Sequence, residues 1–367
     1  MSLKNLVYRK VPPSLRPRLA YLNYRVRDLL DFKKSFNMAK CLMQVESEKI
    51  NYVPSVFLFH ITMKCNLRCP TCCYILESPD NIGGGGYIKV SDFEDVINKY
   101  ASVIEACGLS GGETLLHPEL DKLLAITKEK KLPTYIATNG ILIKNKIDTL
   151  REYPLDTLSV SADGYNYDTF KEFRGGTEKQ FDSILEGLSL LRKYDIKFLL
   201  SFLLTSQNVG EIGKMLEFAG MVKPSKVNFH NINPHGDERY LSLTTDNMKV
   251  VRALDDVVNK TDYSFDIELP TVFTTDSKYF KSAKCTMPWY HCMINYRGSI
   301  SPCCQLVHSE EYGNMFKGYD FNSDKIREFR RTILYGEIMR ECIYCQRRFT
   351  GEEYGIFDVK SKSWILR

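Results

Sequence analysis

Three cysteines with close and uneven spacing are the first residues of this chain whose chemistry is informative. Cys65, Cys69 and Cys72 lie in the segment KCNLRCPTC, directly after a β-rich apolar run. Three thiolates from one loop can hold three irons of a four-iron cluster and leave the fourth iron open to another ligand. A structural zinc site takes four protein ligands. The spacing therefore favours an iron–sulfur cluster with one open coordination position.

Short motifs of glycine, acid, amide and hydroxyl residues recur downstream. They are LSGGE with Gly111, Gly112 and Glu113; ATNG with Thr138 and Asn139; SVSADG with Ser161; and FKEFRGG with Arg174. Glycine permits close backbone approach, a carboxylate pairs with an ammonium group, and an arginine fork suits a carboxylate. Each tripeptide alone is common, but four motifs in order on successive strand ends indicate one shared site.

The elements that would position these motifs alternate between short β-rich runs and helical patterns. We predict strands at Val56–Thr62, Ala106–Ser110, Thr134–Thr138, Thr157–Ser161, Lys197–Leu204 and Lys226–Asn231, and helices at Ser91–Tyr100, Pro118–Lys130, Lys144–Leu150, Phe181–Tyr194, Val209–Ala219 and Thr245–Asn259. Strand and helix alternating six times predict a parallel α/β sheet, with the cysteine loop at its active face. Six units are too few for a closed eight-stranded barrel.

On these motifs the chain resembles the radical S-adenosylmethionine (SAM) superfamily, whose C-x3-C-x2-C signature follows the first strand of a partial barrel. The resemblance covers residues 55 to about 231 and 285 to 345. It implies that Cys65, Cys69 and Cys72 bind a [4Fe-4S] cluster whose open iron chelates SAM, which one electron cleaves to a 5′-deoxyadenosyl radical. It also implies SAM contacts from Gly111, Gly112, Glu113, Thr138, Asn139, Ser161 and Arg174, and Tyr74 as the nearest aromatic side chain for the adenine.

A second cysteine group, with the phrases CTMPW, GSISPCC and ECIYC, resembles the SPASM domain in its shortened twitch form. The resemblance implies one auxiliary [4Fe-4S] cluster held by Cys285, Cys303, Cys342 and Cys345, because no cysteine follows Cys345. Cys303 and Cys304 are adjacent, and only the spacing from Gly298 favours Cys303. Four thiolates with this spacing would equally suit structural zinc if the region stood alone.

The predicted fold class is α/β, with a partial (β/α)6 TIM-like barrel at residues 51–260 and a small twitch/SPASM cluster domain at 261–367. An N-terminal amphipathic helical extension occupies residues 1–50, where apolar residues from Leu15 to Phe36 recur at helical spacing. Residues 1–40 carry ten Lys or Arg against two Asp. This helix could dock on the following domain, or contact an anionic membrane surface or another polyanion.

Composition excludes disorder and membrane spans. The 367 residues are 44% hydrophobic and 26% charged, and the apolar runs are far shorter than the roughly 18 residues of a spanning helix. No secretory signal is visible at the start, so we expect a cytoplasmic protein, with peripheral membrane contact left open. In a reducing compartment the 12 cysteines indicate metal or redox chemistry.

The expected reaction is hydrogen abstraction from a small molecule, which could be phosphorylated or lipid-linked, followed by oxidation, epimerisation or a related change. An alternative is a peptide maturase of ribosomally made precursors, which the roughly 50 residues before the core disfavour, since a leader-binding domain needs roughly 80. The alternative of another class is a zinc-stabilised module that binds nucleic acid or protein. We expect a flavodoxin or ferredoxin-type electron donor and no nucleic acid.

The catalytic residues are not identified by any motif. His230 and His235 lie in NFHNINPHGD, which leaves the sixth predicted strand. They could bind substrate or act as a general base, since imidazole titrates near working pH. Cys292 or Cys304 could instead donate a proton or a hydrogen atom near the substrate.

Overall fold

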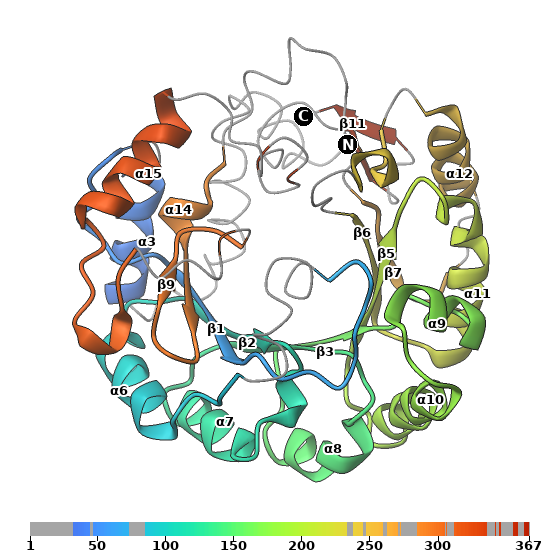
Figure 1. Cartoon of the computed structure of the whole chain (residues 1–367), viewed down its shortest axis with the longest axis horizontal. Coiled ribbons are helices and arrows are strands. Elements are labelled where there is room, and N and C mark those ends of the chain that lie inside the picture. The colour runs from blue at the N-terminus through green and yellow to red at the C-terminus, as the bar shows by residue number, and fades with distance from the viewer. Residues whose placement is uncertain are drawn as a thin grey trace.

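A single curved sheet organises the chain. The computed structural model describes residues 32–44, 47–72, 85–232, 238–244, 247–259, 263–270, 272, 285–304, 306, 312–335, 342, 345, 355–358 and 363–366. Nine of the described strands form one sheet in the order β7-β6-β5-β4-β3-β2-β1-β8-β9. Figure 1 shows this sheet as an arc with helices along its outer side. No helix in the described ranges combines the length and apolar character needed to cross a membrane.

The strands of the main sheet are β1 Val56–Thr62, β2 Ala106–Gly111, β3 Thr134–Thr138, β4 Thr157–Ser161, β5 Leu199–Leu204, β6 Lys226–Asn231, β7 Asp266–Glu268, β8 His291–Asn295 and β9 Ile300–Ser301, and a hairpin pairs β10 Gly355–Asp358 with β11 Ser363–Leu366. The helices are α3 Phe32–Gln44, α6 Val90–Tyr100, α7 Leu120–Glu129, α8 Ile143–Glu152, α9 Tyr167–Arg174, α10 Glu178–Lys193, α11 Ile212–Val222, α12 Met248–Asn259, α14 Met287–Tyr290 and α15 Asp324–Tyr335.

The predicted parallel α/β architecture is confirmed. All six predicted strands are present and pair in parallel in chain order, with ends within two residues of those predicted. The sheet ends at β7 on one side and β9 on the other, which is the form of a partial barrel. The carboxyl ends of β1 to β6 therefore lie along one rim of the arc.

Three strands of the main sheet, and the two strands of the β10–β11 hairpin, were not predicted from sequence. β7 extends the sheet beside β6, β8 pairs in parallel with β1 through Val56 and His291, and β9 returns antiparallel to β8. They lie beyond the predicted domain boundary at residue 260, so the sheet draws on both predicted units. β7 is three residues long and β8 reads HCMIN, without the β-branched run that identified the other strands.

Alternate residues of β1 face opposite sides of the sheet. Phe57 and Phe59 are fully buried against the outer helices, where the Phe59 ring meets the Phe93 ring of α6 with centroids 4.8 Å apart. Leu58, His60 and Thr62 consequently face the inside of the arc. The helices therefore cover the outer face of the sheet, and functional side chains are expected on its inner face.

A second apolar cluster joins α3 to the C-terminal part of the chain. Met38 and Cys41 of α3 are buried with Trp289 of α14, and Trp289 Nε1 donates to the Ser47 carbonyl at 2.7 Å. The prediction that the N-terminal extension docks on protein therefore holds for α3, whereas residues 1–31 lie outside the described residues. Phe36, which the predicted apolar stripe placed on the docked side, is 54% exposed.

Candidate active site

The first cysteine group occupies the loop that leaves β1 at the inner rim of the sheet. Cys69 is buried, and Cys65 and Cys72 are half-buried. The Cys72 amide donates to the Cys69 carbonyl at 3.1 Å, which turns the loop back on itself. Burial is the main cause that raises the pKa of Cys65 to about 11, and the negative charges of Glu113, Cys69 and Cys72 add to it. The charges of Cys69 and Cys72 therefore act on the Cys65 thiol, although no three His, Cys, Asp or Glu side chains in the described residues are arranged to hold a single metal ion.

Two glycines at the end of β2 let the cysteine loop lie directly against that strand. Gly111 has a φ of 135°, and a Cβ there would lie 2.0 Å from the Thr62 carbonyl oxygen. A Cβ on Gly112 would lie 2.3 Å from the Lys64 carbonyl oxygen. The Gly112 amide donates to the Thr62 carbonyl at 2.9 Å. These glycines therefore allow the cysteine loop to pack against β2. The sequence alone predicts only a SAM contact for them.

The Glu113 carboxylate ties the ends of β2 and β3 together. It is 1% exposed and accepts hydrogen bonds from Thr138 Oγ1 at 2.6 Å, the Asn139 amide at 2.7 Å and the Leu115 amide at 3.0 Å. Burial raises the pKa of Glu113, while these hydrogen bonds oppose the shift. Both carboxylate oxygens already have partners within the chain.

The network continues from β3 into the cysteine loop. Asn139 Nδ2 donates to Asn66 Oδ1 at 2.7 Å, and Asn66 lies between two of the predicted cluster ligands. No sequence signal marked Asn66, because an isolated asparagine in a loop has no informative spacing. The LSGGE and ATNG motifs therefore meet beside the cysteine loop and position it.

Arg174, the last residue of α9, reaches the same loop from the other side. Its Nη1 donates to Cys69 Sγ at 3.6 Å, its Nη2 donates to the Ser161 carbonyl at 3.2 Å, and Nη2 also lies 2.5 Å from Asp163 Oδ2. The Nε atom is buried and has no hydrogen-bond partner within the described part of the chain. The ends of β4 and α9 therefore place a fixed positive charge and an unused donor beside the cysteines.

The candidate catalytic residues have different environments. His230 is exposed near the end of β6, whose alternate residues Val227 and Phe229 are buried in the core, so His230 lies on the inner side of the arc. His235 lies outside the described residues, as does Tyr74. Cys292 is 3% exposed and packs in the core on the helix side of β8, a placement that does not favour a role near the substrate.

In the second cysteine group, Cys304 interacts electrostatically with Cys285, whereas sequence spacing had selected Cys303 as the ligand. Burial is the main cause that raises the pKa of Cys285 to about 12, and the charges of Cys345, Cys342 and Cys304 add to it. Cys303 instead packs against the apolar cluster that includes Tyr312 and Phe329. Cys303 therefore has an apolar environment, and Cys304 is near enough to Cys285 for its charge to act on that thiol.

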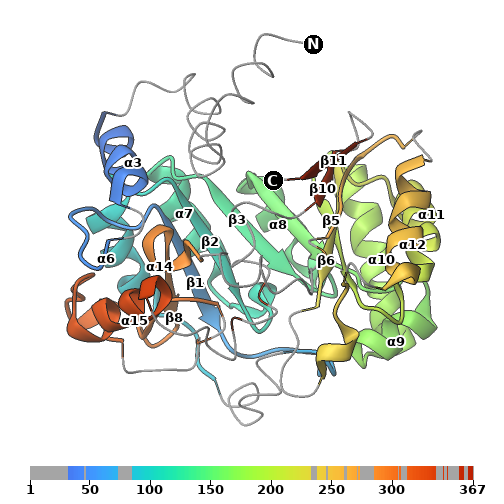
Figure 2. The same cartoon turned by 90° about the horizontal axis from the view of Figure 1, so that it is seen from above.

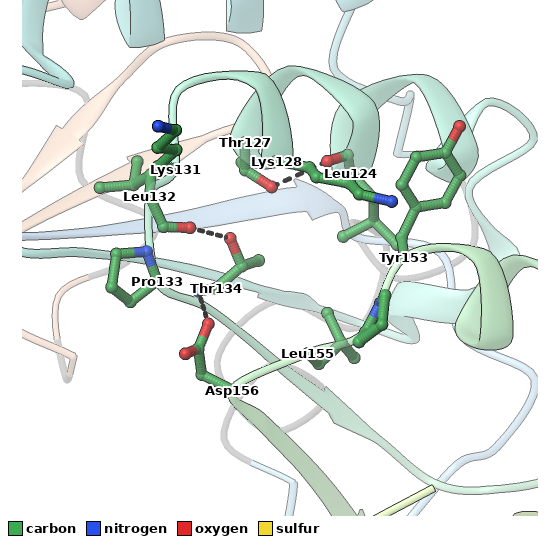
Figure 3. Close-up of a pocket in the computed structure, with 11 residues that line it drawn as sticks. Leu124, Thr127, Lys128, Lys131, Leu132, Pro133, Thr134, Tyr153, Leu155 and Asp156 are labelled. Atoms are coloured by element: carbon green, nitrogen blue, oxygen red, sulfur yellow. Dashed lines mark hydrogen bonds between the residues drawn. The ribbon is translucent and has the colours of Figure 1, made fainter.

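A shallow pocket lies at the opposite edge of the sheet (Figure 3). It is lined by the end of α7 and the residues that precede β3 and β4, including Lys128, Pro133 and Asp156. Its polar groups have partners: Lys128 Nζ donates to the Glu152 carbonyl at 2.9 Å, and Asp156 accepts from the Thr134 amide at 2.8 Å. The pocket lies at the amino ends of the strands, so it is separate from the cysteine loop.

Comparisons with known proteins agree with this geometry. Residues 59–219 match the radical SAM superfamily, and residues 285–346 match the SPASM iron–sulfur cluster-binding domain. The AdoMet-dependent heme synthase of Methanosarcina barkeri is 31% identical over 45% of this chain and 47% of its own length. The subtilosin biosynthesis protein AlbA of Bacillus subtilis is 22% identical over 70% of this chain and 56% of its own length.

Among solved structures, Streptococcus suis SuiB bound to its precursor peptide SuiA superposes with a TM-score of 0.60 at 17% identity, over 85% of this chain and 74% of SuiB. At this level of identity the likeness concerns the fold alone. This chain spans about half the length of each of the two curated relatives named above.

Proposed function

The chain is an enzyme of the radical SAM superfamily with a C-terminal SPASM-like iron–sulfur domain, and from this premise we propose that it abstracts a hydrogen atom from a small-molecule substrate. Its cofactors are [4Fe-4S] clusters and SAM. Together they supply a 5′-deoxyadenosyl radical, and the protein supplies orientation and exclusion of water. The family assignment replaces the alternative of a zinc-stabilised binding module.

The observation that carries the proposal is the network around the cysteine loop. Glu113 joins the ends of β2 and β3, and Asn139 joins β3 to the loop between Cys65 and Cys69. This arrangement fixes the three thiols relative to the strand ends at which a bound ligand would lie. Such support of ligands by surrounding residues is typical of functional metal sites.

We assign the cluster ligands and SAM contacts as follows. Cys65, Cys69 and Cys72 hold the first cluster, and Cys285, Cys304, Cys342 and Cys345 hold one auxiliary cluster. The buried and unpartnered Nε of Arg174 is suited to the carboxylate of SAM, because a guanidinium pairs well with a carboxylate. Thr138 and Glu113 act mainly by positioning the turn that contains Asn139. His230 is the candidate that contacts the substrate from β6.

The first experiment measures iron, sulfide and 5′-deoxyadenosine after anaerobic reconstitution, with dithionite as the reductant. We expect about eight irons per chain, falling to about four in Cys65→Ala/Cys69→Ala/Cys72→Ala with loss of 5′-deoxyadenosine. Full SAM cleavage by the triple variant would overturn the assignment of the first cluster. A flavodoxin or ferredoxin-type protein is proposed as the natural donor and can replace dithionite in the same assay.

A second candidate function is maturation of a ribosomally made peptide. It is favoured by the alignment with AlbA, a bacteriocin biosynthesis protein, over 70% of this chain. The two candidate substrate classes can be distinguished with a cell extract. The extract is added to the SAM cleavage assay either untreated or after protease digestion. Stimulation that survives digestion supports the small molecule, whereas stimulation that digestion abolishes supports the peptide.

Cytoplasmic location with contact to an anionic membrane surface is also a proposal. On α3 the exposed Phe36 and Met43 lie on the same side of the helix as Lys40, whose Nζ lies 4.6 Å from the centre of the Phe36 ring. Apolar and basic residues on one helical face suit an interfacial helix. Full-length protein should sediment with anionic vesicles, and Phe36→Glu/Met43→Glu should sediment less. Equal sedimentation of both proteins would end this proposal.

A further inference from the structure

We infer that Asp163 is a positioning residue that holds the Arg174 guanidinium against the Cys69 sulfur and thereby raises the reduction potential of the cluster bound there. The inference rests on the proposed function, because it takes Cys69 as a cluster ligand. It concerns how easily the cluster accepts the electron that starts the reaction. Asp163 makes no hydrogen bond to Cys69 and acts through Arg174, whose Nη2 it contacts. This effect opposes that of its own negative charge on Cys69 and must exceed it.

The geometry fixes Arg174 from three directions. Nη1 points to Cys69 Sγ at 3.6 Å, while Nη2 contacts the Ser161 carbonyl at 3.2 Å and Asp163 Oδ2 at 2.5 Å. The side chains of Arg174 and Asp163 are 16% and 12% exposed. Water therefore screens this ion pair weakly compared with a surface pair. The guanidinium is held as a rigid cation beside one particular sulfur.

Asp163 is itself held from a second side and in an uncommon backbone conformation. Its Oδ1 accepts a hydrogen bond from the Leu203 amide of β5 at 2.6 Å, and its φ is 51°, in the left-handed region. Few residues other than glycine adopt this region readily, with asparagine and aspartate among the exceptions. In this unfavourable backbone conformation, one carboxylate oxygen of Asp163 contacts β5 and the other contacts Arg174. Such local strain is often found at functional sites.

The effect on the cluster follows from electrostatics. Reduction adds one negative charge to the cluster, and a nearby cation stabilises the more negative state. Hydrogen bonds to cluster sulfurs and nearby charge are among the main determinants of iron–sulfur potentials. Without the carboxylate of Asp163, the guanidinium would lose its ion-pair partner and keep only its contacts with the Ser161 carbonyl and the Cys69 sulfur. Its contact with Cys69 would then loosen, and reduction would become less favourable.

The test is a redox titration of the reconstituted full-length protein followed by electron paramagnetic resonance. The signal of this cluster is identified by its change when SAM is added, and the auxiliary cluster provides an internal reference. Asp163→Asn is the principal variant, because asparagine tolerates the same backbone conformation and can still accept from the Leu203 amide. Arg174→Lys is the second variant, because lysine keeps the charge and loses the planar fork.

We expect both variants to keep the iron content of the wild type and to show an equilibrium constant for one-electron reduction at least tenfold lower, a shift of 59 mV. Asp148→Asn is the matched control, because it removes the same charge from an exposed pair in which Asp148 lies 3.2 Å from Arg151 on α8. Its potential should equal that of the wild type.

Unchanged potentials in Asp163→Asn and Arg174→Lys at full iron content would overturn the inference. An equal shift in the auxiliary cluster would also overturn it, because a general disturbance would then explain the change. If Asp163→Asn did not retain iron, Arg174→Lys would still decide the matter. Failure of the proposed function would look different: the wild-type protein would then show no SAM-responsive cluster to titrate.

Discussion

At the scale of single residues, the auxiliary site shows what spacing can and cannot specify. Cys303 and Cys304 are adjacent, and spacing from Gly298 selects Cys303. The structure packs Cys303 against the cluster of Tyr312, Ile326 and Phe329, and the charge of Cys304 acts on Cys285. The sequence predicts which other cysteines belong to this site, but the direction of a side chain depends on which neighbours it packs against.

This assignment predicts different outcomes for two neighbouring substitutions. Cys304→Ser should lose the auxiliary cluster, with iron falling from about eight to about four per chain, whereas Cys303→Ser should keep it. Iron and sulfide analysis after anaerobic reconstitution, with the absorbance spectrum as a second readout, distinguishes them. If only Cys303→Ser lost iron, Cys303 would be the fourth ligand, as the spacing from Gly298 predicts.

At the scale of elements, the six strands of the parallel sheet were predictable because they are apolar, short and separated by helices. Three of the four motifs were correctly placed at strand ends for the same reason, whereas FKEFRGG lies at the end of α9. α9 was missed, although Asn166 and Thr169 form a capping box at its start, because its eight residues lack a long apolar stripe. The hydrogen bonds that Glu113 makes to β3 were also missed, since they connect residues brought together only by the fold.

Substitution of a glycine at the end of β2 should disturb the cysteine loop locally and leave the rest of the fold intact. In Gly112→Ala the added Cβ would lie 2.3 Å from the Lys64 carbonyl oxygen, so the start of the cysteine loop must move. We expect the first cluster to be lost, with about half of the iron, while the circular dichroism spectrum is retained. Gly213→Ala on α11 is the control, since nothing lies within 4 Å of its added Cβ. Full iron in Gly112→Ala would contradict this account of the glycines.

The buried position of His117 predicts that the free energy of unfolding depends on pH. It is fully buried between the Ile88 carbonyl, 3.0 Å from Nε2, and the Glu119 amide, which donates to Nδ1 at 3.2 Å. Burial lowers the pKa of His117. Below the unfolded value of about 6.5 the unfolded chain therefore binds more protons at this residue, and stability falls as pH decreases.

The measurement compares the thermal midpoints of the wild type and His117→Gln between pH 7.5 and pH 5. We expect the wild type to lose more stability on acidification than the variant, which lacks the titrating group. The other histidines are common to both proteins and cancel in the comparison. Parallel pH profiles would show that His117 does not titrate differently in the two states.

At the scale of the whole molecule, one buried arginine joins parts of the chain that are far apart in sequence. Arg330 of α15 is 1% exposed and donates to the carbonyls of Glu48, Pro288 and Phe321, at 3.2, 3.3 and 2.9 Å. It thereby connects the segment before β1, α14 and the loop before α15 to α15 itself. Figure 2 shows α3, α14 and α15 together at one end of the sheet.

We expect Arg330→Met to lower the free energy of unfolding by about 3 kcal/mol or more, because three carbonyl acceptors lose a charged donor. Lys325→Met on the same helix is the control, since its side chain is 57% exposed. Urea unfolding of both variants measures the difference. A loss below about 1 kcal/mol in Arg330→Met would mean that the apolar cluster, and not the arginine, holds these segments together.

The pairing of β8 with β1 also has a consequence for synthesis. β1 lies inside the finished sheet, yet its second neighbour begins at His291, which is 235 positions after its partner Val56. At about 5–20 residues per second, translation leaves one edge of β1 unpaired for roughly 10 to 50 seconds. A strand edge beside fully buried phenylalanines can pair with another nascent chain during that interval. The yield of folded protein should therefore depend on chaperones that cover this edge until the ribosome has released β8.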